Sequence, residues 1–291
     1  MTAADPVTTV FMPVALGVIM FGLGLGLRGA DFTRVLVYPK AVLIALACQT
    51  VLLPLLCFFI AKGSVLPPEL AVGLMLLAAS PGGTSANLYS HLANGDVALN
   101  ITLTAINSVL AIITLPIIVN LALAHFMQES GSLPLQFGKV MQVFLIVIGP
   151  VALGMVVNAR RPALAALLHK PVKLLSVLFL GSVIALAIFK SRGDIPDYVQ
   201  SVGLACLSFN LLSLGLGYGV PRLLGLDLRQ SIAIGMEIGI HNATLAITIA
   251  LSPLMLNNAA MAVPAAVYGV VMFFTAAAFG WWVNRGRAAE A

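Results

Sequence analysis

The sequence predicts an all-α integral membrane protein, and three observations support this fold class. Of the 291 residues, 60% are hydrophobic and 9% are charged, whereas a soluble domain carries about 25% charged residues. The apolar runs reach roughly 20 residues, which is the length that crosses a bilayer core. The runs lack the alternation of barrel strands, and an open strand would leave its backbone groups unpaired in lipid.

Nine apolar segments are predicted to span the membrane, with short polar connections between them. They cover residues 8–27, 41–61, 69–91, 97–124, 138–158, 171–190, 199–220, 228–252 and 260–283. The connections contain most of the charged residues, as in the RGADFTR stretch that follows the first segment. Because charged side chains are costly in the bilayer core, these stretches mark where the segments end.

Lysines and arginines predict the orientation of the segments. If the N-terminus is outside, the outer connections hold only Lys62, Lys139, Lys190 and Arg192. The cytoplasmic connections then hold Arg28, Arg34, Lys40, Arg160, Arg161, Lys170, Lys173, Arg222, Arg229, Arg285 and Arg287. The positive-inside rule therefore predicts a cell (inner) membrane protein with a cytoplasmic C-terminus. Trp281 and Trp282 fit an interfacial anchor there, and no cleavable signal peptide is expected.

Three other features of the sequence are explained by packing or by the membrane. The Gly24–Gly29 stretch matches G-x-G-x-x-G, but it ends a membrane segment, so it indicates close helix approach and not a dinucleotide site. The net charge of +5 comes from scattered basic residues, which argues against nucleic-acid binding. The cysteines lie inside apolar runs and are expected to pack there: Cys48, Cys57 and Cys206.

The third segment contains a break. It continues into SPGGTSANLYSH, so Pro81, Gly82 and Gly83 fall where the apolar helix should still be running. Proline removes a backbone donor and glycine loosens a helix. A break of this kind is tolerated where it lines a cavity, because the freed carbonyls can then hold a metal ion.

The eighth segment carries Glu237, His241 and Asn242 near its middle. Glu237 is the only one of ten acidic residues that falls in the interior of a predicted segment, since Glu69 stands at the very start of another. An ionised side chain there costs about 2.5–3.5 kcal/mol, so it is expected to face a cavity and meet a cation or a proton. The alternative is a structural carboxylate that is protonated or paired with His241 one turn away.

The third and eighth segments share a design, which predicts an internal repeat. Each is an apolar helix with a polar, glycine-containing centre, and Asn87 and Asn242 stand about half the chain apart. Residues 1–130 then form a four-helix repeat and residues 131–291 a five-helix repeat. The unequal helix count inverts one unit relative to the other, as transporters with alternating access require.

These two blocks resemble the bile acid:sodium symporter family, in its bacterial branch. The similarity rests on LAASPGGTSANLYSHLANGDVALN together with EIGIHNATLAI, and it covers nearly the whole chain. The resemblance implies a core domain and a panel domain, in the nine-helix form of the fold. It also implies that two discontinuous helices cross in the core beside two sodium sites.

The resemblance assigns the first sodium site to Asn87, Asn100, Thr104 and Glu237. Asn100 and Thr104 share one helical face at i and i+4. The chain departs from the family pattern at Ala86, where serine is usual, and at Asn100, where serine is common. An amide oxygen can replace a hydroxyl as a hard ligand, whereas Ala86 can offer only its carbonyl.

The second sodium site implied by the resemblance uses the side chains of Gln49, Glu237 and His241 with the carbonyls of Ile238 and Ile240. The family commonly places glutamine where this chain has His241. Imidazole nitrogen suits a hard alkali cation poorly, and histidine can take up a proton instead. Coupling to one sodium and one proton, or a neutral histidine bonded within the core, are therefore alternatives to a second sodium.

The resemblance also implies a substrate site beside the crossing, near Thr84, Ser85 and Asn242. Half-helix N-termini and amide donors suit a carboxylate there. The expected function is sodium-coupled symport of a small organic anion, such as a bile acid-like or a pantoate- or keto-acid-type compound. The alternatives are a proton-coupled transporter, an exporter or a channel of related architecture.

An enzyme is not expected, because the sequence has neither H-E-x-x-H nor G-x-S-x-G. The expected partners are Na⁺, the organic anion and the lipid bilayer, without nucleic acid or an obligate protein partner. No cofactor is expected apart from sodium as the coupling ion.

Overall fold

The computed structural model describes residues 12–127, 137–172, 174–175, 178, 195–252 and 255–290. Within these ranges the regular structure is helical, apart from one isolated bridge between Gly82 and His241. Four helical stretches are long and apolar enough to cross a membrane: Pro39–Gly63, Val97–Phe126, Gln200–Leu223 and Ala260–Arg285. The prediction of an all-α protein with long apolar helices is confirmed.

The helices follow the predicted segments closely. In chain order they are α1 (Met12–Gly26), α2 (Gly29–Thr33), α3 (Pro39–Ala47), α4 (Leu53–Gly63), α5 (Pro68–Ala79), α6 (Thr84–Leu92), α7 (Val97–Phe126), α8 (Phe137–Arg160), α10 (Ile195–Leu223), α11 (Leu228–Gly239), α12 (Ala243–Leu251) and α13 (Val263–Glu290). Short turns at Arg34–Leu36 and Ala260–Ala262 are 3₁₀-helical. Most of the predicted 171–190 segment lies outside the described residues, so the count of nine stays a prediction.

Helices α3 and α4 form one continuous span that contains a π-helical turn at Cys48–Leu52. Pro54 follows this turn and has no backbone N–H to donate. The wider turn carries Gln49, whose buried side chain donates to the carbonyl of Ala78 at 3.2 Å. Because π-turns often occur at functional sites, this turn supports a functional role for Gln49.

Two segments are interrupted, and they lie at the centre of the molecule. Helix α5 ends at Ala79 and α6 begins at Thr84, while α11 ends at Gly239 and α12 begins at Ala243. Helix α5 packs beside α12, and α6 packs beside α11, so the two segments cross where they are broken. Every residue from Leu70 to the end of α5 and from Ser231 to the end of α11 is buried, which explains why α5 is apolar all round there and encloses Glu237 of α11 away from solvent.

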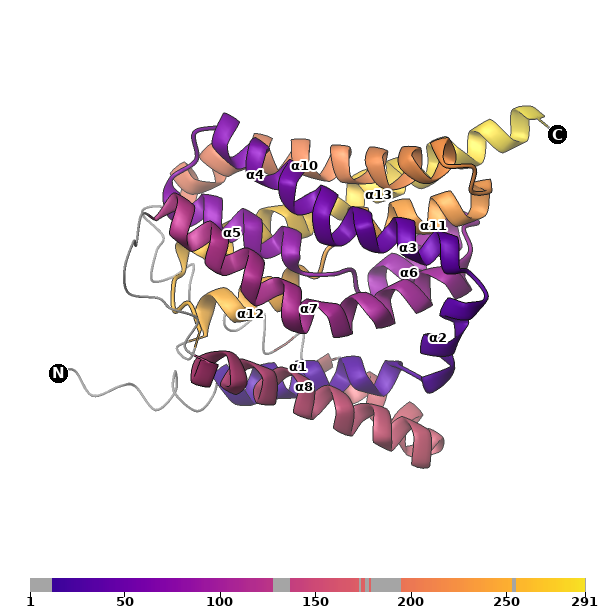
Figure 1. Ribbon diagram of the computed structural model, residues 1–291, viewed down its shortest axis with the longest axis horizontal. Helices are drawn as coiled ribbons and strands as arrows, with labels where there is room; N and C mark the ends of the chain where they lie inside the picture. Colours follow the sequence, from indigo (N-terminus) through magenta and orange to yellow (C-terminus); the bar gives the residue numbers. More distant parts are fainter. Residues whose placement is uncertain are drawn as a thin grey trace.

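Helices α1 and α8 pack together along one side of the molecule (Figure 1). A Cβ added at Gly24 would lie 2.1 Å from the carbonyl oxygen of Val151, and one at Gly154 would lie 2.5 Å from that of Phe21. The two backbones can therefore approach only because both positions are glycine. Asn158 donates to the carbonyl of Leu27 at 3.0 Å and joins the adjacent helix ends.

The surface of the described residues suits a lipid environment. Large apolar side chains are exposed on several helices, including Leu43, Phe59 and Phe274. Trp281 and Trp282 are also exposed, and the Arg285 guanidinium lies 4.1 Å from the centre of the Trp281 ring. Cys48, Cys57 and Cys206 are buried and free, as expected for packing residues.

Candidate functional site

Glu237 lies on the last turns of α11 and is fully buried. Its Oε2 accepts a hydrogen bond from the Thr104 hydroxyl at 2.7 Å, and its Oε1 accepts one from the Asn107 amide at 3.4 Å. Among the described residues, the one ion pair joins Arg34 to Asp31, far from this carboxylate in the chain. A buried carboxylate without a basic partner needs a cation or a proton to balance it.

The break between α5 and α6 closes over the same carboxylate. A Cβ added at Gly82 would lie 2.9 Å from the Cδ and Oε1 of Glu237. The backbone N–H of Asn242 donates to the carbonyl of Pro81 at 3.0 Å, so the two breaks are joined directly. Backbone groups that one break leaves without a partner in their own helix are thus partly hydrogen-bonded to backbone groups of the other break.

One face of α7 supplies further polar groups to the site. Asn100, Thr104 and Asn107 follow one another at i, i+4 and i+7, and all three are buried. The Asn100 amide donates to the carbonyl of Ala233 at 2.7 Å. Since the amide groups of Asn100 and Asn107 are used as donors towards α11, their oxygens are the atoms left to accept.

Several buried amide oxygens lack a hydrogen-bond partner within the described part of the chain. They are the side-chain oxygens of Gln49, Asn87, Asn100 and Asn107. Oxygens of this kind are ligands that hard cations prefer. The first predicted cation site is therefore chemically suited to sodium, because Asn87, Asn100, Thr104 and Glu237 all offer oxygen.

Asn107 was missed by the sequence analysis. It lies one turn beyond Thr104 on the same face of α7 and contacts Glu237 directly. The available signal was an asparagine inside an apolar run, spaced so that it shares a face with Asn100 and Thr104.

His241 lies beyond the end of α11, inside the second break. Its Nδ1 lies 3.1 Å from the carbonyl oxygen of Ser80, which can only accept, so Nδ1 carries the proton. Its Nε2 is buried and has no partner among the described atoms. The alternative in which His241 pairs with Glu237 along a continuous helix is wrong, because α11 ends at Gly239.

The second predicted site has a mixed donor set. Gln49 and His241 donate to the carbonyls of Ala78 and Ser80, which α5 leaves free where it ends. The atoms left to accept are one amide oxygen and one imidazole nitrogen, together with the carboxylate of Glu237 and nearby carbonyls. Imidazole nitrogen is a poor ligand for an alkali cation, so these residues fit sodium less well than the first set.

The three residues expected to bind substrate lie where α6 and α12 begin. Thr84 and Ser85 are the first two residues of α6, and Asn242 is the N-cap of α12. The Asn242 side chain accepts from the backbone N–H of Leu245 at 3.0 Å. A Cβ at Gly83 would lie 3.9 Å from the Asn242 amide nitrogen, so the two helix starts are neighbours.

Comparison with known proteins decides the family. Residues 13–196 match the Sodium Bile acid symporter family, which is well over half of the chain. The chain belongs to this family. It is accordingly a multi-pass membrane transporter and not an enzyme, as the sequence analysis expected.

Several relatives of this symporter family are similar over most of the chain. The Bacillus subtilis sodium-dependent transporter YocS is 32% identical over 89% of this chain and 78% of its own length. The probable sodium/metabolite cotransporter BASS1 of Arabidopsis thaliana chloroplasts is 29% identical, over 88% of this chain and 62% of its own length. The ileal sodium/bile acid cotransporter of Mus musculus is 24% identical, over 84% and 70% respectively.

Proposed function

We propose that this symporter family member couples the movement of sodium to transport of a small organic anion. The observation that carries the proposal is the buried carboxylate of Glu237, held by α7 at the crossing of two interrupted helices. An ionised group in this position is stabilised by a bound cation. Sodium is favoured as that cation by the family and by the names of the relatives.

The first sodium site in this proposal consists of Glu237, Asn87, Asn100 and Thr104, with Asn107 added from the structure. The Thr104 hydroxyl lies within hydrogen-bond distance of Glu237 and of the Asn100 carbonyl, and because it donates to these acceptors, the lone pairs of its oxygen remain for a cation. These groups come from α6, α7 and α11. A bound cation would therefore hold three separate elements together while neutralising the carboxylate.

A second cation would use Gln49, Glu237 and His241 with the carbonyls of Ile238 and Ile240. Its support is the unpaired amide oxygen of Gln49 in the described structure. His241 weakens the case, because it brings nitrogen where a hard cation prefers oxygen.

The architecture in this proposal has nine membrane helices in two inverted repeats, residues 1–130 and 131–291. It is supported by the matching lengths of the interrupted segments: α5 and α11 have 12 residues each, and α6 and α12 have 9. The interrupted pair would lie in a core domain, and α1 with α8 would belong to a panel against which the core rocks. Inverted repeats of this kind provide alternating access.

The substrate we propose is a small carboxylate bound near Thr84, Ser85 and Asn242. The N-termini of α6 and α12 are neighbours there, and both favour negative charge. Bile acid-like and pantoate- or keto-acid-type anions are candidates, since relatives are named as bile acid and metabolite cotransporters. Cation and anion would favour the same ordered crossing, which couples their binding positively.

The test is the stabilisation of the purified full-length protein by NaCl, with KCl at the same ionic strength as reference. Ligand that binds only the folded state stabilises it by about 2.7 kcal/mol at 100 times its dissociation constant, so sodium should raise the melting temperature. Glu237→Gln keeps the shape of the side chain but removes the charge, and it should abolish the sodium response. Adding small carboxylates with sodium then screens for the substrate.

Glu69→Gln is the matched control, because Glu69 lies in the first turn of α5 outside the site. This variant should keep the sodium response of the wild type. An undiminished sodium response in Glu237→Gln would contradict the proposal.

Proton-coupled transport by the same fold is the second candidate function. It is favoured by the buried Nε2 of His241, which has a free lone pair within the described structure and can accept a proton. Accumulation in proteoliposomes under an imposed proton gradient without sodium would decide for it. Accumulation that requires a sodium gradient would decide for the first candidate.

A further inference from the structure

The carbonyl of Gly239 is the last of α11 and stands two residues after Glu237. Carbonyls at a helix end lack an intrahelical partner, and this one accepts from two side chains instead. The Asn210 amide of α10 donates to it at 2.9 Å, and the Tyr268 hydroxyl of α13 donates to it at 2.9 Å. Both donors are fully buried, so water does not compete with either hydrogen bond.

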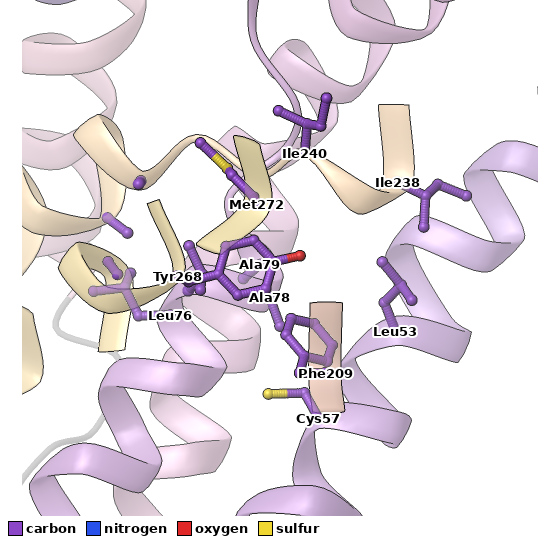
Figure 2. Packing of buried hydrophobic residues seen from close by; sticks show 14 of the residues in the cluster. Leu53, Cys57, Leu76, Ala78, Ala79, Phe209, Ile238, Ile240, Tyr268 and Met272 are labelled. Atoms are coloured by element: carbon purple, nitrogen blue, oxygen red, sulfur yellow. The ribbon is translucent and has the colours of Figure 1, made fainter. Parts of the chain in front are cut away.

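The two donors are themselves held in place. The Thr275 hydroxyl donates to the side-chain oxygen of Asn210, which turns the amide nitrogen towards Gly239. The ring of Tyr268 contacts those of Phe209 and His241, with centroid distances of 5.8 and 5.3 Å. Figure 2 shows Tyr268 beside Phe209 in the core, with Ile238 and Ile240 above them in that view.

The backbone of α11 is also pressed against α10 at this point. A Cβ at Gly239 would lie 2.3 Å from Cδ2 of Leu214, and one at Gly217 would lie 3.0 Å from the Cα of Gly235. Helix α10 packs extensively against both α11 and α13. The end of α11 is therefore held by both packing and hydrogen bonds from α10 and α13.

We propose that Asn210, Tyr268 and Thr275 are positioning residues for cation binding, a proposal that rests on the proposed function. Asn210 and Tyr268 bond the Gly239 carbonyl and Thr275 orients Asn210, so together they fix the conformation of the break before a cation arrives. Glu237 and the carbonyls of Ile238 and Ile240 are then held in one arrangement. Sodium affinity is higher in a preorganised site, because the cation does not have to order the break itself.

Tyr268→Phe tests this role, since it keeps the ring contacts with Phe209 and His241 and removes only the hydroxyl. The measurement is the sodium concentration that gives half of the maximal thermal stabilisation of the full-length protein. We expect this midpoint to rise about three- to tenfold, the range for one lost buried hydrogen bond. Thr275→Val should raise it in the same direction, because it frees the Asn210 amide to turn.

Thr248→Val is the matched control. Thr248 is buried on α12, and its hydroxyl donates to the carbonyl of Thr244 within the same helix at 2.7 Å. This variant also loses a buried hydrogen bond, so its melting temperature without sodium should fall. Its sodium midpoint should match the wild type, because the lost bond does not reach α11.

The outcomes distinguish this inference from the proposed function. A sodium response in the wild type with unchanged midpoints in Tyr268→Phe and Thr275→Val would overturn the positioning role alone. No sodium response in the wild type would overturn the proposed function and this inference with it. If Tyr268→Phe is not recovered folded, Thr275→Val decides the matter against the same control.

Discussion

At the residue scale, Gly82 lies directly against the group on which the site depends. A Cβ at this position would lie 2.8 Å from the carbonyl oxygen of Glu237 and 2.9 Å from its carboxylate carbon. The carbonyl oxygen is a backbone atom, and the carboxylate is held by Thr104 and Asn107, so even a methyl group requires a shift of α11 or of the break. The glycine is thus required for the approach of the two segments and not only for the break in α5.

Gly82→Ala should therefore lower the melting temperature and remove the sodium-dependent stabilisation. Gly215→Ala is the control: it lies in α10, and no described atom outside its own helix lies within 4 Å of the added Cβ. Alanine in a helix interior is favoured over glycine by about 1 kcal/mol, so this variant should be at least as stable as the wild type. Thermal unfolding in NaCl and KCl measures both effects. A Gly82→Ala protein with the wild-type sodium midpoint would contradict this account of the close approach.

At the element scale, α11 and α12 begin with equivalent caps that differ in what surrounds them. Asp227 accepts from the backbone N–H of Gln230 at 2.8 Å, and Asn242 accepts from that of Leu245 at 3.0 Å. Loss of an N-cap costs about 1 kcal/mol in either place. Only Asn242 lies beside the start of α6, where the anion is proposed to bind.

Asp227→Ala and Asn242→Ala should both lower the melting temperature in the absence of ligand. Asn242→Ala should also lose the additional stabilisation by a carboxylate that the sodium-containing screen identifies, because the cap orients the α12 N-terminus at that site. Asp227→Ala should retain it. Equal responses of the two variants to the carboxylate would argue against anion binding at the start of α12.

The elements also show what the sequence could and could not predict. The first break was predictable because Pro81, Gly82 and Gly83 act locally on the helix. The second break contains no proline. It was predictable only because its polar, glycine-containing sequence resembles that of the first break. The π-turn at Cys48–Leu52 leaves no comparable mark in composition, so the sequence did not predict it.

The contacts around the site were harder to predict than the breaks. Gln49, Asn87, Asn100, Thr104 and His241 were expected from the family resemblance, and their roles as ligands remain predictions. The residues that hold Gly239 come from α10 and α13, whose pairing with α11 depends on tertiary packing. Asn210 inside an apolar run was the one available signal, because a polar side chain in a membrane helix usually bonds to a neighbouring helix.

At the scale of the whole molecule, several helix ends and connecting loops lie together at one end of the protein. The loop before α7 is tied to α11 by the bond from the Asp96 N–H to the Arg229 carbonyl. The end of α6 is tied to α13, since Asn284 donates to the carbonyl of Leu92. Helix α2 and the C-terminal ends of α8 and α13 lie towards the same side in Figure 1. Arg28, Arg34, Arg161, Arg229 and Arg285 therefore belong to one end of the molecule.

That basic end is predicted to be cytoplasmic, and the turn after α4 at the other end is predicted to face outside. Ser64 in that turn and Arg161 after α8 are both exposed. A membrane-impermeant maleimide on intact cells should label Ser64→Cys at once and Arg161→Cys only after permeabilisation. The native cysteines are buried and should leave the wild type unlabelled. The reverse labelling pattern would contradict the prediction and show that the protein has the opposite orientation in the membrane. The starts of α6 at Thr84 and of α12 at Ala243 would then be reached from the opposite side.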